Sequence, residues 1–269
     1  MKEILLENEK VIIYKQDNVD YLQFKRLLEY PNLIHAYTLK SKGELNFVPE
    51  YQDSEMLEKS KQKICKVLGL QTQNIVKPHQ THTNIVKKVT EPIEKFNDVD
   101  GMITGKTKIA LCTTSADCTT FLIYDPVKHV IGNIHSGWRG TVQKIGQNAI
   151  KEMIEAYGSK PKDIICCICP HIRKCHFEVE TDVMELFKKE FRNLSLGEGI
   201  IEKGQIIDGK QKYDIDTTKI NIELLKQAGL KQENIIDSGI CTVCNESQFH
   251  SYRAHKQQSG RNAGIICRY

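Results

Sequence analysis

The sequence predicts a layered α/β or α+β protein. Three observations support this class: short apolar segments typical of strands recur along the 269 residues, about four segments have helical periodicity, and turn residues separate them. No Pro-, Gly- or Ser-rich linker divides the chain, and we find no internal repeat. We therefore expect a single domain over residues 1–269.

The first half of the chain is expected to hold mostly strands and one long helix. The strands are expected at Lys10–Tyr14, Leu33–Leu39, Ile75–Lys77, Asn84–Val89, Val99–Thr104 and Lys108–Thr113. Lys40–Glu50 is expected to be a loop. Asp53 or Ser54 can cap a helix that runs to about Leu68, and Gly69 is a typical helix stop.

Strands and helices alternate in the second half. The strands are expected at Thr119–Tyr124, His129–Ile134, Ile164–Ile168, Ile235–Cys241 and Ala263–Arg268. The helices are expected at Thr141–Tyr157, at Thr181–Phe191, and from a cap at Asp216 to Ala228. The glycine-rich stretch Asn193–Lys210 is expected to be a surface excursion, and Asn245–Arg261 a polar loop.

Composition excludes several functional classes. Apolar residues make up 40% of the chain and the mean hydropathy is −0.41, which is typical of a soluble globular protein. No stretch of about 18 apolar residues is present, so no membrane span is expected. The net charge of +4 is small and spread along the chain, which argues against a nucleic-acid partner. The charged N-terminal segment lacks a signal-peptide core, so a cytoplasmic location is expected.

Ten cysteines without an export signal indicate reduced thiols rather than a disulfide framework. Those of Asp163–Cys169 belong to a segment that predicts a buried strand, where cysteine acts as a small apolar residue. Cys241-x-x-Cys244 has the spacing of half a zinc site or of a redox pair, but no second CxxC accompanies it. We expect a structural or incidental role there. His171 and His176 flank Arg173-Lys174-Cys175 in a loop, and we do not expect a metal site there.

The residues best suited to catalysis or metal binding lie in Ser115–Gly140. If the strands on either side of Asp125-Pro126 pair as a hairpin, Cys118 comes close to His135. Cys118 could then be a nucleophile with His135 as its base. Alternatively, both could bind zinc with a third ligand from His79 or His82, which would leave an open position. The spacing alone does not choose between these chemistries, nor exclude two unrelated strand-end residues.

Several motifs along the chain together resemble the YfiH-like family, also called laccase-domain or polyphenol oxidoreductase proteins. The motifs are Leu45-Asn46-Phe47, Gln80-Thr81-His82, Asp100–Thr104, Ser115-Ala116-Asp117-Cys118, His135–Gly140, Pro170–Val179, Ser251-Tyr252-Arg253 and Gly260-Arg261. The resemblance implies a single three-layer α/β/α domain with a mixed sheet, related to bacterial toxin cysteine hydrolases. It also implies a zinc ion held by His82, Cys118 and His135.

The resemblance implies purine nucleoside chemistry as well. Family members are described as cleaving adenosine, inosine and methylthioadenosine with phosphate, and as deaminating adenosine. Zinc suits deamination because it lowers the pKa of bound water, and Asp117 could move protons. Arg139 and the amides after Gly137 are candidates for holding phosphate. Asn46 and Gln80 are expected to contact the substrate.

Three other functions remain open from the sequence. One is a metal-free cysteine amidohydrolase, for example in peptidoglycan precursor editing, and another is a purine- or protein-binding module without turnover. The third is a copper-dependent phenol oxidase, which the family's older name implies. Ordinary multicopper laccases need several His-x-His pairs, and this sequence contains none.

Overall fold

The computed structural model describes residues 2–49, 52–92, 95–194 and 198–269. Its strands form a seven-stranded sheet, a six-stranded sheet and a three-stranded sheet. The two larger sheets contain both parallel and antiparallel pairs. The predicted α/β class with mixed pairing is therefore confirmed. The strands divide between two large sheets, whereas we expected one sheet between two helical layers.

The seven-stranded sheet has the order β1-β2-β3-β4-β16-β8-β5. Its strands are β1 (Lys2–Glu7), β2 (Val11–Gln16), β3 (Val19–Phe24), β4 (Leu33–Thr38), β5 (Ile75–Val76), β8 (Ala110–Ser115) and β16 (Asn262–Arg268). The sequence analysis did not predict β1 and β3. The C-terminal strand β16 pairs with both β4 and β8, so the end of the chain lies in the middle of this sheet.

The six-stranded sheet carries the hairpin predicted around Asp125-Pro126. Its order is β15-β11-β9-β10-β7-β6. Its strands are β6 (Val86–Lys88), β7 (Gly101–Thr104), β9 (Thr119–Asp125), β10 (Val130–Ser136), β11 (Ile165–Ile168) and β15 (Ile235–Asp237). Three cysteines lie buried in and just after β11, as predicted for Cys166, Cys167 and Cys169.

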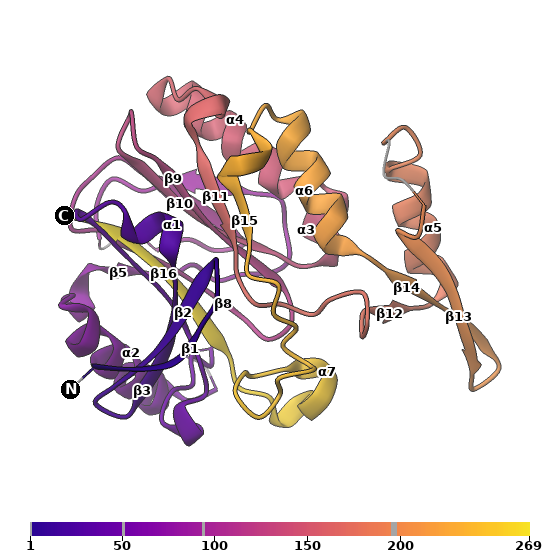
Figure 1. Ribbon diagram of the computed structural model, residues 1–269, viewed down its shortest axis with the longest axis horizontal. Helices are drawn as coiled ribbons and strands as arrows, with labels where there is room; N and C mark the ends of the chain where they lie inside the picture. The colour runs from indigo at the N-terminus through magenta and orange to yellow at the C-terminus, as the bar shows by residue number, and fades with distance from the viewer. Residues whose placement is uncertain (1, 50–51, 93–94, 195–197) are drawn as a thin grey trace.

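The two large sheets pack face to face, because alternate residues of each strand point to opposite sides. In β9, Leu122 and Tyr124 join the core between the sheets, whereas Phe121 and Ile123 pack under helices α4 (Ile145–Tyr157) and α6 (Thr217–Gln227). Helix α2 (Ser54–Leu68) packs on the other face of the seven-stranded sheet. Figure 1 shows α4 and α6 on one side of the sheets and α2 on the other.

A buried asparagine on β10 joins the two sheets. The Asn133 amide donates hydrogen bonds to the carbonyls of Leu111 in β8 (2.8 Å) and Gly264 in β16 (2.7 Å). Its oxygen accepts a hydrogen bond of 2.6 Å from the Thr113 hydroxyl. A Cβ on Gly264 would lie 2.6 Å from the Thr120 methyl group, so glycine permits this close approach of the sheets.

Helix α2 follows the sequence closely. Asp53 caps it by accepting a hydrogen bond from the Met56 amide (2.9 Å), and Gly69 ends it with a φ of 69°. The helix expected over Thr141–Tyr157 is instead two helices, α3 (Trp138–Val142) and α4. Lys144, with a left-handed φ of 61°, interrupts the helix between them. The single-helix prediction was therefore wrong at its start.

The third sheet forms a unit with helix α5 (Thr181–Glu190), which Figure 1 shows beside the two large sheets. Its strands are β12 (Glu178–Val179), β13 (Ile201–Ile207) and β14 (Lys210–Ile215), in the order β12-β14-β13. The surface excursion expected over Asn193–Lys210 therefore contains a strand, although its positions 195–197 lie outside the described residues, as does Glu50 of the first loop. The short helices α1 (Lys25–Leu28) and α7 (Tyr252–His255) complete the α-helices of the described residues.

Among the described residues, every helix is too short or too polar to cross a membrane.

Candidate functional site

The β9–β10 hairpin brings Cys118 to His135, as predicted. In the register of this hairpin, His135 lies opposite Thr120 and Ser136 lies opposite Thr119. Cys118 directly precedes the first strand, so both side chains lie at the same edge of the sheet. His135 is buried and Cys118 is half-buried.

The Gln80–Thr83 loop brings His82 to the same edge. The Gln80 side chain pairs with the backbone of Thr114: its amide donates to the carbonyl (2.8 Å) and its oxygen accepts from the N–H (2.8 Å). His82 itself has a φ of 65°, in the left-handed region that non-glycine residues seldom occupy. Such conformations persist where surrounding contacts enforce them, and they are frequent at functional sites.

Asp100, just before β7, supplies those contacts. Its carboxylate accepts hydrogen bonds from the backbone N–H groups of Thr81 (3.3 Å), His82 (3.1 Å) and Thr83 (2.7 Å). One of its oxygens also lies 2.7 Å from Nδ1 of His135. One fully buried carboxylate therefore fixes both the loop that carries His82 and the orientation of the His135 ring.

His82, Cys118 and His135 form a compact cluster. Their three candidate ligand atoms lie within 4.8 Å of one another. The Cys118 sulfur is 3.8 Å from Nε2 of His82, and the two imidazole rings meet edge to face with centroids 5.1 Å apart. A Cβ on Gly137 would lie 2.5 Å from Cδ2 of His82 and 3.3 Å from the Cys118 sulfur, so only glycine leaves room for the cluster.

The protonation equilibria of the cluster are strongly shifted. Burial would raise the pKa of Cys118, but the charge of His135 and hydrogen bonds from both histidines lower it from 9.0 to about 6. Burial would lower the pKa of His135, but Cys118 and Asp100 raise it to about 9. Burial likewise opposes ionisation of Asp100, yet its hydrogen bond and charge interaction with His135 hold its pKa at about 2. Without a metal, the cluster therefore favours a thiolate beside an imidazolium.

The donor set also fits a metal ion. Thiolate and imidazole are zinc ligands, and three protein ligands leave a coordination position open for a reactant. The carboxylate of Asp100 on the far nitrogen of His135 is the partner that metal-bound histidines usually have. His79, the other histidine considered, lies outside the cluster. The geometry thus suits a three-ligand metal centre and, without metal, a cysteine–histidine pair.

A pocket with aromatic walls adjoins Cys118. Its aromatic side chains are Trp138, Phe177 and Tyr252, and hydroxyl groups come from Thr119, Ser136, Thr141 and Thr217. Such a lining suits a flat heterocycle with an attached hydroxylated group, because aromatic rings stack on the former and hydroxyls bind the latter. The sequence analysis did not predict a role for these rings.

Two other predicted site residues, Asp117 and Arg139, have different surroundings. Asp117 lines the pocket, but its carboxylate already accepts hydrogen bonds from the Thr242 hydroxyl (2.7 Å) and the Arg253 backbone N–H (2.6 Å). Arg139 is exposed, and its guanidinium carbon lies 4.2 Å from the ring centroid of Trp138.

Asn46 contacts two segments that are distant in sequence. Its side-chain oxygen accepts a hydrogen bond of 2.9 Å from the Arg261 backbone. Its backbone N–H donates to the Ser60 hydroxyl (2.9 Å). Through these contacts Asn46 joins the loop before β16 to helix α2.

Comparison with known proteins gives the chain a family. The sequence signature described as "Multi-copper polyphenol oxidoreductase laccase" matches residues 38–269. The purine nucleoside phosphorylase YlmD of Bacillus subtilis is 32% identical over 217 residues, which cover 77% of this chain and 76% of that protein. The adenosine deaminase RL5, from an unknown prokaryotic organism, is 30% identical over 203 residues, covering 72% and 75%.

Solved structures share the fold over nearly the whole chain. The YfiH protein of Bacillus licheniformis, titled hypothetical, superposes with a TM-score of 0.81 at 25% identity, covering 99% of each chain. YlmD of Geobacillus stearothermophilus superposes with a TM-score of 0.80 at 22% identity, covering 98% of each chain. The chain therefore belongs to the YfiH-like family of laccase-domain, or polyphenol oxidoreductase, proteins.

Proposed function

We propose that this chain is a zinc-dependent purine nucleoside enzyme that cleaves adenosine, inosine and methylthioadenosine with phosphate and deaminates adenosine. The observation that carries the proposal is the convergence of His82, Cys118 and His135 beside the aromatic pocket. The relatives named purine nucleoside phosphorylase and adenosine deaminase support the substrate class.

The three side chains would hold the zinc ion. Zinc bound in such a site supplies Lewis acidity and lowers the pKa of water. The Asp100 carboxylate accepts a hydrogen bond from Nδ1 of His135, which directs Nε2 of that ring toward the cluster. The hydrogen bonds that the backbone N–H groups of residues 81–83 donate to Asp100 would keep His82 in place when the substrate enters.

The pocket would bind the nucleoside. The rings of Trp138, Phe177 and Tyr252 offer stacking surfaces for the purine, and the threonine and serine hydroxyls offer partners for the ribose. Arg139, stacked on Trp138 at the protein surface, is our candidate for the phosphate ligand. Asp117 lines the pocket and accepts hydrogen bonds from Thr242 and from Arg253, which also lines the pocket, so we propose Asp117 as a positioning residue.

Two neighbouring histidines provide a matched test. His82→Ala should lose the zinc ion of this cluster and turnover of adenosine, whereas His79→Ala, next to the same loop but outside the cluster, should retain both. Products should be separated by chromatography with and without phosphate: inosine reports deamination, and adenine with ribose 1-phosphate reports phosphorolysis. Wild-type turnover in His82→Ala would contradict the proposal. Oxygen uptake with phenols that scales with bound copper would support an oxidase instead.

The second candidate function is a metal-free cysteine amidohydrolase. The lowered pKa of Cys118, the raised pKa of His135 and the carboxylate of Asp100 behind the ring favour it, because together they resemble a nucleophile, a base and an orienting acid. This function requires amide hydrolysis that chelators leave unchanged and that alkylation of Cys118 abolishes. Chelator-sensitive adenosine turnover would exclude it as the main activity.

A further inference from the structure

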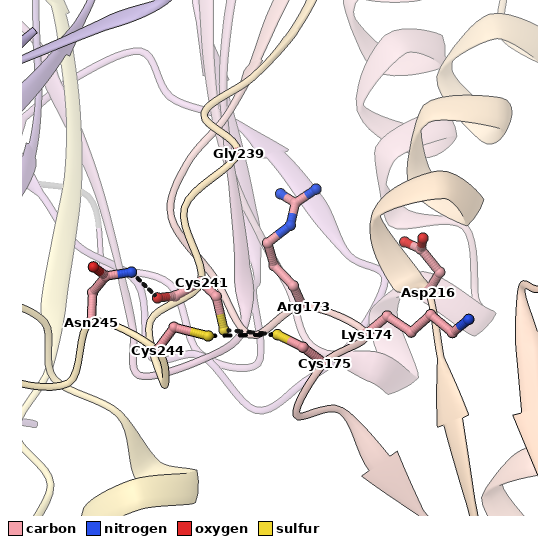
Figure 2. A pocket seen from close by; sticks show the side chains of 8 residues that line it. All are labelled: Arg173, Lys174, Cys175, Asp216, Gly239, Cys241, Cys244 and Asn245. Carbon is pink, nitrogen blue, oxygen red and sulfur yellow. Dashed lines mark hydrogen bonds between the residues drawn. The ribbon is translucent and has the colours of Figure 1, made fainter. Parts of the chain in front are cut away.

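Four side chains from two distant loops converge outside the pocket described above. They are Cys175 and His176, in the turn before β12, and Cys241 and Cys244, in the turn after β15. Their candidate ligand atoms lie within 4.8 Å of one another. Figure 2 shows the sulfurs of Cys175, Cys241 and Cys244 directed toward one another. The CxxC that lacked a partner in the sequence therefore meets a Cys-His pair.

The spacing of these atoms matches a tetrahedral zinc site. With Zn–S bonds of about 2.3 Å and Zn–N bonds of about 2.0–2.1 Å, a tetrahedron places two sulfurs about 3.8 Å apart and a sulfur and a nitrogen about 3.6 Å apart. The Cys175 sulfur lies 3.7 Å from each of the other two sulfurs. Nδ1 of His176 lies 3.2, 3.8 and 3.6 Å from the sulfurs of Cys175, Cys241 and Cys244.

The same distances argue against a disulfide. A disulfide needs sulfurs about 2.05 Å apart, and all three cysteines are free thiols here. One bridge would also leave the third cysteine and the histidine without a shared partner. A single ion of tetrahedral preference uses all four donors at once, and a site with four protein ligands has no position open for a reactant.

The surrounding backbone is arranged to support the four donors. Residues 171 and 241 form an isolated parallel bridge, so the two turns are already paired beside the cluster. The backbone N–H groups of Cys244, Arg173 and Val243 face the Cys241 sulfur. Arg173 also binds Asp237 at the end of β15 through two hydrogen bonds of 2.9 Å. Polar groups and ion pairs around the ligands are typical of the surroundings that orient metal ligands.

We propose that Cys175, His176, Cys241 and Cys244 bind a second, structural zinc ion. Binding converts three thiols to thiolates and releases their protons, with no oxidation or reduction. The ion joins two turns that are 66 residues apart in sequence at Cys175 and Cys241.

The proposed ion would also stabilise one wall of the pocket. Thr242, between the two ligands of the second turn, donates its hydroxyl proton to Asp117. The Arg253 guanidinium donates to the carbonyl of His176 (2.7 Å), and Arg253 lines the pocket. Loss of the ion should therefore lower the thermal midpoint and weaken nucleoside binding without removing the His82–Cys118–His135 cluster.

Elemental analysis of five proteins tests the proposal. Wild type should contain about two zinc ions per chain, Cys244→Ser and Cys118→Ala about one each, and the double variant none. Ser247→Ala, an exposed change in the same turn, is the control that should keep both ions. Wild-type zinc content in Cys244→Ser, or a disulfide among these cysteines in protein purified with zinc, would overturn the proposal.

Cobalt substitution gives a readout that does not depend on activity. In the Cys118→Ala background, cobalt at the second site should show the intense sulfur-to-metal charge-transfer bands of a thiolate-rich tetrahedral centre. Adding Cys244→Ser should weaken these bands, and adding Ser247→Ala should leave them unchanged. Absence of the bands in folded, cobalt-treated Cys118→Ala protein would also overturn the proposal.

Discussion

Replacing Asp100 with asparagine separates the role of this carboxylate from its bulk. Asparagine has nearly the same shape, but it presents a single oxygen where Asp100 accepts hydrogen bonds from the loop N–H groups and lies 2.7 Å from Nδ1 of His135. Its NH₂ group must then face donors that the carboxylate satisfied. We therefore expect the loop that carries His82 to loosen and His135 to lose its orienting partner.

The Asp100→Asn change should lower the zinc affinity of the cluster by a predictable amount. Removing a carboxylate that orients a ligating histidine typically costs about 10–100-fold in metal affinity. Because each tenfold change equals about 1.4 kcal/mol, the loss of binding free energy is about 1.4–2.8 kcal/mol.

Acid should also destabilise the protein through Asp100. The pKa of this carboxyl is lowered from 3.8, so its ionised form stabilises the native protein above pH 3.8. That stabilisation is lost as the pH falls toward about 2.

Zinc competition against a chromogenic chelator measures this affinity. The matched control is Asp98→Asn, because Asp98 is exposed and its carboxylate accepts a hydrogen bond from the Thr81 hydroxyl in the same loop (2.9 Å). The measurement should be made in the Cys244→Ser background, so that the second cluster does not contribute. Wild-type zinc affinity in a folded Asp100→Asn protein would refute the assigned role of Asp100.

Four further changes test separate parts of the account. In the Cys244→Ser background, Gly137→Ala should lower zinc affinity at least about tenfold, because the added Cβ would lie 2.5 Å from Cδ2 of His82; unchanged zinc content at limiting zinc would count against this packing. Asn133→Ala should lower the free energy of unfolding, measured with urea, by about 2–4 kcal/mol, because two buried carbonyls lose their hydrogen-bond donor. A decrease below about 1 kcal/mol would contradict the role of Asn133 in joining the sheets. In metal-free protein, alkylation of Cys118 followed by mass spectrometry should rise with pH around a midpoint of about 6, since its pKa is lowered, and a midpoint near 9.0 would refute that shift. Arg139→Ala should raise the KM for phosphate and leave deamination unchanged, because only phosphorolysis consumes phosphate; equal loss of both activities would argue against an anion-binding role.

Local patterns allowed much of the fold to be predicted. The Asp53 cap and the Gly69 stop fixed helix α2, because both act on neighbouring backbone groups. The Asp125-Pro126 turn between two apolar runs predicted the hairpin, and its register brings Cys118 to His135. The resemblance to the YfiH-like family supplied His82, which the hairpin alone did not identify.

The remaining features depend on contacts between distant segments. The four-donor cluster pairs Cys175 with Cys241, and neither turn has enough ligands to indicate a metal by itself. Asp100 looked like part of a motif, yet its role depends on how β7 and the Gln80–Thr83 loop meet. The break at Lys144 was hidden because the apolar periodicity continues across it. These features follow from tertiary packing, which sequence patterns of short range do not report.

The most direct test of the central claim is adenosine turnover by one preparation in three states: as purified with zinc, after chelation, and after zinc is restored. Chromatography with and without phosphate identifies the products. We predict adenine and ribose 1-phosphate with phosphate, inosine without it, loss of both after chelation, and their return with zinc. Turnover that survives complete removal of zinc, or absence of any product from zinc-replete protein, would contradict the account.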